Sequence, residues 1–290
     1  MSQRSGLVVV DKSAGMTSHD VVARVRRLAG TRKVGHAGTL DPMATGVLLV
    51  GLNRATRLLG YLTLTEKEYD ATVRLGAVTT TDDAEGETLR EEPVDQLTDD
   101  AVRDAAGRFV GELDQRPSAV SAVKVDGRRA YARVRAGEDV VLPTRPVTVH
   151  ELTVRDLRRT EQHLDVDVSV RCSSGTYIRA IARDLGAVLG VGGHLTMLRR
   201  TAVGPFGLDA ARPLEVLADE LVLLDIDELA RRCFPTCRLD DDRSRDVTHG
   251  RSLPVELGAT GPVAVFDPTG SFLALYEQRG DLAAPVAVFV

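Results

Sequence analysis

The stretch Gly35–Gly46, GHAGTLDPMATG, comes directly before an apolar run, Val47–Leu52, that is typical of a buried strand. Its glycines permit positive φ angles and the close approach of another backbone or a ligand. Pro42 fixes its own φ and biases Asp41 toward an extended conformation. The stretch therefore predicts a stiff loop that presents one carboxylate. By itself it leaves open a structural turn in which Asp41 caps a backbone amide.

The length and composition indicate a globular protein. The chain has 290 residues, of which 43% are hydrophobic, which is enough for one large domain and a small one. No apolar stretch reaches membrane-spanning length and residues 1–10 lack a secretory signal pattern, so we expect a cytoplasmic protein without membrane contact. The three cysteines, Cys172, Cys233 and Cys237, match neither a disulfide framework nor a zinc pattern. We therefore expect no metal site.

The net charge of −5 conceals an uneven distribution of charge along the chain. Residues 1–60 contain nine Lys and Arg against three Asp and Glu, whereas residues 61–110 contain five against thirteen. The basic excess coincides with the glycine-containing loop, and a basic surface neutralises the phosphates of a polyanion. It predicts a phosphate-binding surface or, alternatively, a solvated helix face. The basic residues just before the loop are Arg24, Arg26, Arg27, Arg32 and Lys33.

Short strands and helices are predicted around this loop. A strand at Leu7–Val10 precedes a helix that Thr17 or Ser18 caps and that ends at Gly30. After the loop and its strand, Asn53 is expected to cap a short helix.

The segment from residue 66 to residue 110 predicts a strand, an acidic loop and a helix. Residues 66–76 alternate in polarity, and the acidic stretch 79–93 is loop-like. Thr98 begins an amphipathic helix that reaches Phe109. The apolar residues that share one face of the strand are Tyr69, Ala71, Val73 and Leu75.

Residues 111–150 predict a protruding, basic excursion with one short helix. Beyond it, residues 163–172 alternate as a half-buried strand, and residues 177–189 form an amphipathic helix. Arg179 and Arg183 lie one turn apart on a face of that helix other than the apolar one.

The pattern of elements favours a mixed α+β fold on a mainly antiparallel sheet, because strands outnumber helices and the two do not alternate strictly. From about residue 234 short segments bounded by Gly, Pro and Asp predict a small C-terminal all-β domain, joined through a charged bridge, RLDDDRSRD. The strand candidates there are residues 252–257, 262–266, 272–276 and 285–290.

Several catalytic motifs are absent from the sequence, and their absence argues against the corresponding chemistries. The loop ends in Thr45-Gly46-Val47 rather than in Gly-Lys-Ser/Thr, so it is no P-loop, and the chain has no G-x-S-x-G elbow. Asp41 has no close acidic neighbour in its segment, which argues against paired catalytic carboxylates. What remains is one carboxylate that acts as a nucleophile or base beside a cation that keeps it ionised. Arg179 is a candidate for that cation.

Five ordered motifs resemble those of the TruB-type pseudouridine synthases, the bacterial tRNA pseudouridine-55 synthases, and cover most of residues 6–210. Ser13 stands where the family usually has a proline. The motifs are DKSAGMTSHDVV (11–22), the catalytic block 35–52, EKEYDATVRLGAVTTTDDAEG (66–86), CSSGTYIRAIARDLG (172–186) and HLTMLRRTAVGPF (194–206).

The resemblance implies an isomerase that converts uridine 55 in the T loop of tRNA to pseudouridine. It implies that Asp41 is the nucleophile, which attacks C6 of the uracil or C1′ of the ribose, and that Arg179 pairs with it. Tyr69 would stack on the flipped uracil and is a candidate to take the C5 proton. No redox, metal or group-transfer step is involved, so no cofactor is expected.

The resemblance also implies the contacts with RNA. His36 would contact the RNA near the flipped nucleotide, Tyr177 and Leu198 would line the pocket, and Lys12 would support the loop. The excursion 111–150, with Arg128 and Arg129, corresponds to the insertion that grips the T stem-loop.

The expected division is a catalytic domain of residues 1–233 followed by a PUA-like RNA-binding domain of residues 234–290. The self-contained insertion implies direct recognition of tRNA without an obligatory protein partner. An RNA-binding factor that helps tRNA to fold, independently of catalysis, remains the alternative.

Overall fold

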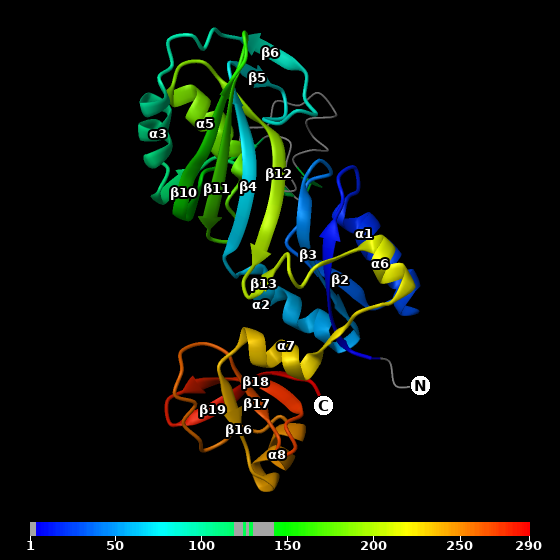
Figure 1. Ribbon diagram of the computed structural model, residues 1–290. Helices are drawn as coiled ribbons and strands as arrows, with labels where there is room; N and C mark the ends of the chain where they lie inside the picture. The colour runs from blue at the N-terminus through cyan, green and yellow to red at the C-terminus, as the bar shows by residue number, and fades with distance from the viewer. Residues whose placement is uncertain (1–3, 119–123, 126–127, 130–141) are drawn as a thin grey trace.

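The computed structural model describes residues 4–118, 124–125, 128–129 and 142–290 (Figure 1). Its largest element is an eleven-stranded sheet with the main path β14-β1-β3-β12-β4-β11-β10-β7. Neighbours in this path are antiparallel, except that β3 with β12 and β1 with β14 are parallel, so the predicted mainly antiparallel sheet is confirmed. In the order of the path, the strands span Arg212–Pro213, Gly6–Lys12, Thr45–Leu52, Gly193–Val203, Lys67–Leu75, Leu164–Cys172, Arg145–Arg159 and Gly111–Gln115.

Helices cover the sheet at two places (Figure 1). Helix α5 (Ile178–Val188) packs against β12 and β4, and α3 (Asp99–Gly107) packs beside it against β10. Helix α1 (Ser18–Ala29) packs against α6 (Leu214–Asp219) and β3. The apolar sides of these helices and strands form one continuous core, which includes all four residues predicted to share a face of β4. Three short strands extend the sheet: β2 (Val34–Ala37), β13 (Phe206–Gly207) and β15 (Leu224–Asp225).

The predicted start and end of α1 are confirmed. The Thr17 side chain accepts a hydrogen bond from the backbone N–H of Asp20, and the Asp20 carboxylate accepts one from the backbone N–H of Thr17. Such a reciprocal capping box satisfies two amides that have no partner within the helix. Gly30 ends the helix in the left-handed conformation, with a φ of 60°.

Asn53 does not cap a helix as predicted. It is the first residue of a 3₁₀ helix, η1 (Asn53–Leu58), which continues into α2 (Leu59–Thr63). Its side chain accepts a hydrogen bond from Thr31 Oγ1 and donates one to the carbonyl of Arg4, both at 2.7 Å. The Asn53 side chain therefore links the segments that contain Thr31 and Arg4 instead of capping a helix.

The acidic stretch that was predicted as a loop is partly a hairpin. Strands β5 (Ala77–Thr79) and β6 (Thr88–Glu91) pair antiparallel, and residues 80–87 form the turn between them.

The excursion 111–150 begins and ends in the main sheet, because β7 and β10 are its first and last parts and pair with each other. Between them the structure describes a pair of two-residue strands, β8 (Lys124–Val125) and β9 (Arg128–Arg129). The predicted short helix falls outside the described residues.

The C-terminal segment forms a separate four-stranded sheet with its own apolar core (Figure 1). The prediction of a strand at 252–257 is wrong: Pro254 lacks a backbone donor, and only a single bridge between Leu253 and Ala283 forms. The predicted charged bridge contains the helix α8 (Asp241–Thr248), whose N-cap is the Asp240 carboxylate. The strands are β16 (Thr236–Arg238), β17 (Val263–Phe266), β18 (Phe272–Arg279) and β19 (Leu282–Val288).

Helix α7 (Ile226–Cys233) lies between the two sheets (Figure 1) and contacts both β1 and β18. An apolar cluster joins residues of both sheets, and the guanidinium of Arg57 lies 4.6 Å from the centre of the Phe289 ring. The backbone N–H of Phe272 donates to Asp227 Oδ1 at 2.8 Å. The C-terminal sheet is therefore docked on the larger one. Within the described chain, the helices are all too short or too polar to span a bilayer.

Candidate active site

Five of the predicted site residues line one cavity of about 270 Å³: Asp41, Tyr69, Tyr177, Arg179 and Leu198. They come from four separate segments, namely the loop before β3, β4, the N-terminus of α5 and β12. The cavity is at the small end of the range for ligand pockets, which is roughly 300–1,000 Å³. Its volume is large enough for one planar base.

The loop that carries Asp41 is fixed on both sides of that residue. The backbone N–H of Leu40 donates to Ser18 Oγ at 2.9 Å, and that hydroxyl donates to the carbonyl of Leu40 at 3.1 Å. The carbonyl of Pro42 accepts a hydrogen bond from Lys12 Nζ at 3.2 Å. Contacts with the N-terminal segment thus hold the backbone of both neighbours of Asp41.

Lys12 is fully buried beneath this loop and does not line the cavity. Its ammonium also donates to the carbonyls of Met16 at 2.7 Å and Ser13 at 3.1 Å. Burial lowers the pKa of Lys12 to about 8, although the Asp41 carboxylate opposes this effect. The geometry is that of a support for the loop.

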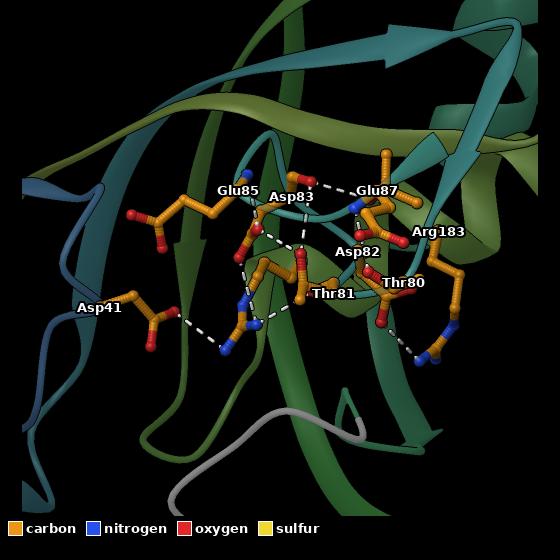
Figure 2. A network of polar contacts seen from close by, with 10 residues as sticks. Asp41, Thr80, Thr81, Asp82, Asp83, Glu85, Glu87 and Arg183 are labelled. Atoms are coloured by element: carbon orange, nitrogen blue, oxygen red, sulfur yellow. Dashed lines mark hydrogen bonds and ion pairs between the residues drawn. The ribbon is translucent and has the colours of Figure 1, made fainter. Parts of the chain in front are cut away.

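Arg179 joins the loop to the β5–β6 turn. Its Nη2 lies 3.1 Å from Asp41 Oδ2, and its Nη1 lies 3.2 Å from Asp83 Oδ2 and donates to the carbonyl of Thr81 at 3.0 Å. Figure 2 shows Asp41 and Asp83 on either side of the shared guanidinium. Arg179 is 4% exposed and Asp83 2%, so this guanidinium is buried between the two carboxylates although it lies outside the apolar stripe of α5. We call Asp41, Arg179 and Asp83 the ion-pair bridge.

The β5–β6 turn holds Asp83 in a fixed orientation (Figure 2). Its carboxylate accepts hydrogen bonds from the Thr81 hydroxyl and from the backbone N–H of Glu85, the latter at 3.1 Å. Asp82 adopts a positive φ of 58° and pairs with Arg183 at 3.3 Å. Two arginines of α5 therefore attach the turn to the helix.

Tyr69 is buried at the start of β4, with 7% of its surface exposed. Burial raises the pKa of its phenol above the usual 10, while the Arg200 cation opposes the rise through its charge and a hydrogen bond. The phenol is therefore protonated at neutral pH, which suits a ring that stacks on a base.

Two further buried cations adjoin the cavity and were not singled out from the sequence. Lys67 Nζ donates to the carbonyls of Thr63 and Thr65, both at 2.8 Å, and burial together with the Arg200 charge lowers its pKa to about 8. Arg200 donates to carbonyls of the loop and of β3. We call Lys12, Lys67 and Arg200 the buried cation cluster.

Of the other residues predicted to contact RNA, none whose side chain is described lines this cavity. His36 is on β2, outside the cavity lining, with its ring edge-on to that of His19 at 5.5 Å between centroids. Its Nδ1 is buried and has no hydrogen-bond partner among the described residues. Arg128 and Arg129 lie in β9, but their side chains are outside the described part of the chain.

Sequence reasoning missed Asp83, Lys67 and Arg200. Asp83 and Lys67 lie within the motif at residues 66–86 and Arg200 within the motif at 194–206, yet nothing in their spacing distinguishes them from surface charges. Only their burial in the folded chain does so. Throughout the described residues, His, Cys, Asp and Glu side chains form no group of three or more that could hold a metal ion.

Three family models match consecutive parts of the chain. Residues 26–178 match the TruB family pseudouridylate synthase N-terminal domain. Residues 179–235 match the tRNA pseudouridylate synthase B C-terminal domain, and residues 234–290 match the C-terminal domain of tRNA pseudouridine synthase II.

The chain is also similar over nearly its whole length to curated proteins. It is 56% identical to the tRNA pseudouridine synthase B of Arthrobacter sp. (strain FB24), covering 98% of this chain and 96% of that protein. It is 57% identical to the protein of the same name from Thermobifida fusca (strain YX), covering 98% of both.

Among solved structures, an H/ACA RNP bound to a substrate RNA containing 2′-deoxyuridine has a similar chain. The TM-score is 0.75 at 25% sequence identity, and the match covers 98% of this chain and 85% of the other.

Proposed function

Because this chain belongs to the TruB family of pseudouridylate synthases and isomerises uridine to pseudouridine in tRNA, we propose that it acts on uridine 55 of the T loop with Asp41 as the attacking carboxylate. The observation that carries this proposal is the ion pair between Asp41 and Arg179 at the cavity. The guanidinium fixes the direction of the carboxylate that would attack the nucleotide.

The reaction rearranges bonds within one nucleotide. Asp41 forms a bond to C6 of the uracil or to C1′ of the ribose, and the N1–C1′ bond breaks. The base then turns, C5 bonds to C1′ and the bond to Asp41 breaks, which restores its carboxylate. The C5 proton leaves and N1 gains a proton. Both points of attack are compatible with one carboxylate that lines a cavity large enough for one base.

The target uridine must leave its stack to reach Asp41. Flipping a nucleotide costs a few kcal/mol, and stacking on an aromatic ring returns about 1–3 kcal/mol. We assign the stacking to Tyr69, whose neutral ring lines the cavity. Its hydroxyl is also the candidate acceptor of the C5 proton, with the Arg200 cation as the group that favours its ionised form.

The rest of the chain would hold the RNA. We propose that residues 111–150, with Arg128 and Arg129, grip the T stem-loop and that His36 contacts the RNA next to the flipped nucleotide. Residues 1–233 would form the catalytic domain and residues 234–290 a PUA-like RNA-binding domain. Since both RNA-holding parts belong to this chain, it would act without an obligatory protein partner. We place this activity in the cytoplasm.

The substitution Asp41→Asn tests the proposal because it preserves shape and removes the nucleophile. We expect the variant to bind tRNA as the native protein does and to form no pseudouridine at position 55, as measured by chemical mapping of a tRNA transcript. Asp104→Asn, an exposed position on α3, is the matched control and should retain full activity. Pseudouridine at position 55 in the Asp41→Asn reaction would refute the assignment.

The names of the similar proteins do not favour the alternative function, a tRNA folding factor. The same Asp41→Asn variant measures it directly, since a folding role independent of catalysis would leave its acceleration of tRNA refolding intact.

A further inference from the structure

Arg200 occupies a central place in the sheet beside the cavity. Strand β12 lies between β3 and β4, although it follows both by more than a hundred residues in the sequence. Arg200 is directly opposite Gly46 on β3 and Tyr69 on β4. Only 1% of its surface is exposed, and it also lines the cavity.

The Arg200 guanidinium donates to both ends of the stretch that contains Asp41. Its Nε donates to the carbonyl of Val47 at 2.7 Å, and its Nη2 donates to the carbonyl of Gly38 at 3.0 Å. An arginine suits this task because its donors form a rigid planar fork. The loop thus closes around one side chain from a distant strand.

Two glycines of the loop fit this arrangement. A Cβ at Gly46 would lie 2.2 Å from the carbonyl oxygen of Arg200, and one at Gly38 would lie 3.3 Å from Arg200 Nη1. Both glycines also have positive φ angles, of 98° and 77°. The packing of β12 therefore excludes a side chain at Gly46, and the positive φ disfavours one at Gly38.

Arg200 also acts on the phenol of Tyr69. Its charge and its hydrogen bond both lower the pKa of Tyr69, against the larger effect of burial and the smaller effects of Cys172 on β11 and Asp41 on the loop. The same side chain thus hydrogen-bonds the loop of the proposed nucleophile and the phenol of Tyr69, and both Arg200 and Tyr69 line the cavity.

We propose that Arg200 is a positioning residue that fixes the Asp41 loop relative to Tyr69. This role rests on the proposed function, because it concerns the same reaction. It differs from the role of Arg179, which contacts the Asp41 carboxylate itself, since Arg200 contacts the backbone on either side of it.

Two substitutions separate geometry from charge. In Arg200→Met we expect the single-turnover rate of pseudouridine formation to fall by about 100-fold, as for a displacement of about 1 Å at the reacting groups, while the Kd for tRNA changes by less than about threefold. Arg200→Lys restores the charge but cannot provide the fork, so the rate should stay at least about tenfold below native. A native rate in either variant would overturn the proposal.

Arg74→Met is the matched control. Arg74 lies on β4, the strand of Tyr69, and pairs with Asp165 on the partly exposed side of the sheet. Its loss removes one arginine charge without touching the loop, so the rate should remain native. If Arg200→Met does not fold, Arg200→Lys still decides the question.

A measurement without RNA keeps this inference separate from the proposed function. The absorbance titration of Tyr69, obtained by subtracting that of Tyr69→Phe, should move to higher pH in Arg200→Met and remain near native in Arg200→Lys. An unchanged titration in Arg200→Met would refute the contact with Tyr69 even if the native protein modified no tRNA.

A double-mutant cycle between Arg200→Lys and Tyr69→Phe then measures the coupling in the reaction. Because Arg200 acts through Tyr69 and the loop, the effects on the rate should be clearly non-additive. Additive effects would show that Arg200 only stabilises the fold.

Discussion

The ion-pair bridge and the buried cation cluster both lie at the Asp41 loop, and they differ in the groups that face their charges. In the bridge, the guanidinium of Arg179 meets the carboxylates of Asp41 and Asp83. In the cluster, Lys12 and Lys67 donate to backbone carbonyls, and Arg200 donates to backbone carbonyls and hydrogen-bonds the Tyr69 phenol. Among the described residues, none of the three forms an ion pair with a carboxylate within 4.0 Å.

The comparison separates charges that can react with the substrate from charges that hold the backbone in place. A carboxylate that faces a guanidinium is held in a fixed direction, which suits a group that attacks a substrate. A cation that faces carbonyls fixes the path of the chain, and of the three only Arg200 also acts on a proposed reacting group, the phenol of Tyr69. Variants that remove one charge from each region test this distinction.

The largest effect is expected from Arg179→Met, which leaves Asp83 buried without its cation. Breaking a buried pair in this way costs about 3–5 kcal/mol of unfolding free energy. We also expect no measurable pseudouridine formation, because Asp41 loses its partner. Denaturant unfolding and chemical mapping measure the two effects.

Arg183→Met is the control for that prediction. Arg183 lies one turn further along α5 and forms partly exposed pairs with Asp82 and Asp184. Its loss should cost at most about 1 kcal/mol, the range of exposed pairs. A cost equal to that of Arg179→Met would contradict the distinction between the two arginines.

A smaller effect is expected from Asp83→Asn, which keeps the shape of the bridge and removes its distal charge. Arg179 then has one carboxylate instead of two, and the direction of its guanidinium is less strictly fixed. We expect the single-turnover rate to fall by about 10- to 100-fold with an unchanged Kd for tRNA. If Kd rose while the rate stayed native, Asp83 would be part of the RNA-binding surface instead.

The smallest effect on the reaction is expected from Lys12→Met in the buried cation cluster. Its three carbonyl acceptors lose their donor, so the unfolding free energy should fall by about 1–3 kcal/mol at neutral pH. The rate should fall by less than in Asp83→Asn, because Lys12 contacts backbone carbonyls, whereas Asp83 contacts the guanidinium that pairs with Asp41. A larger loss of rate than in Asp83→Asn would show that Lys12 has a catalytic role.

The pH dependence of stability sharpens the assignment of Lys12. Its pKa is about 8 in the folded chain and 10.5 in the unfolded one, so between these values the unfolded chain binds more protons. By linkage, the contribution of Lys12 to stability rises with pH across this interval. The native protein should therefore gain unfolding free energy relative to Lys12→Met from pH 8 to pH 10.5. A difference that shrinks with rising pH would contradict the lowered pKa.

Much of the local structure could be predicted because it depends on neighbours in the sequence. The cap at Thr17, the left-handed end of α1 at Gly30 and the alternation along β4 follow from short-range hydrogen bonding and from the two-residue period of a strand. Asn53 and the segment 252–257 were predicted wrongly because distant partners and a missing amide decided them.

The sequence alone predicts that a stiff loop presents Asp41, and its ordered motifs single out Tyr69 and Arg179 as further site residues. It also identifies the family. Only the tertiary structure decided that Asp83 completes the bridge and that Arg200 holds the loop. The physical reason is the order of the strands in the sheet. Strand β12 inserts between β3 and β4, and α5 packs against it, which brings together charges that lie about 100 to 160 residues apart and share no periodicity.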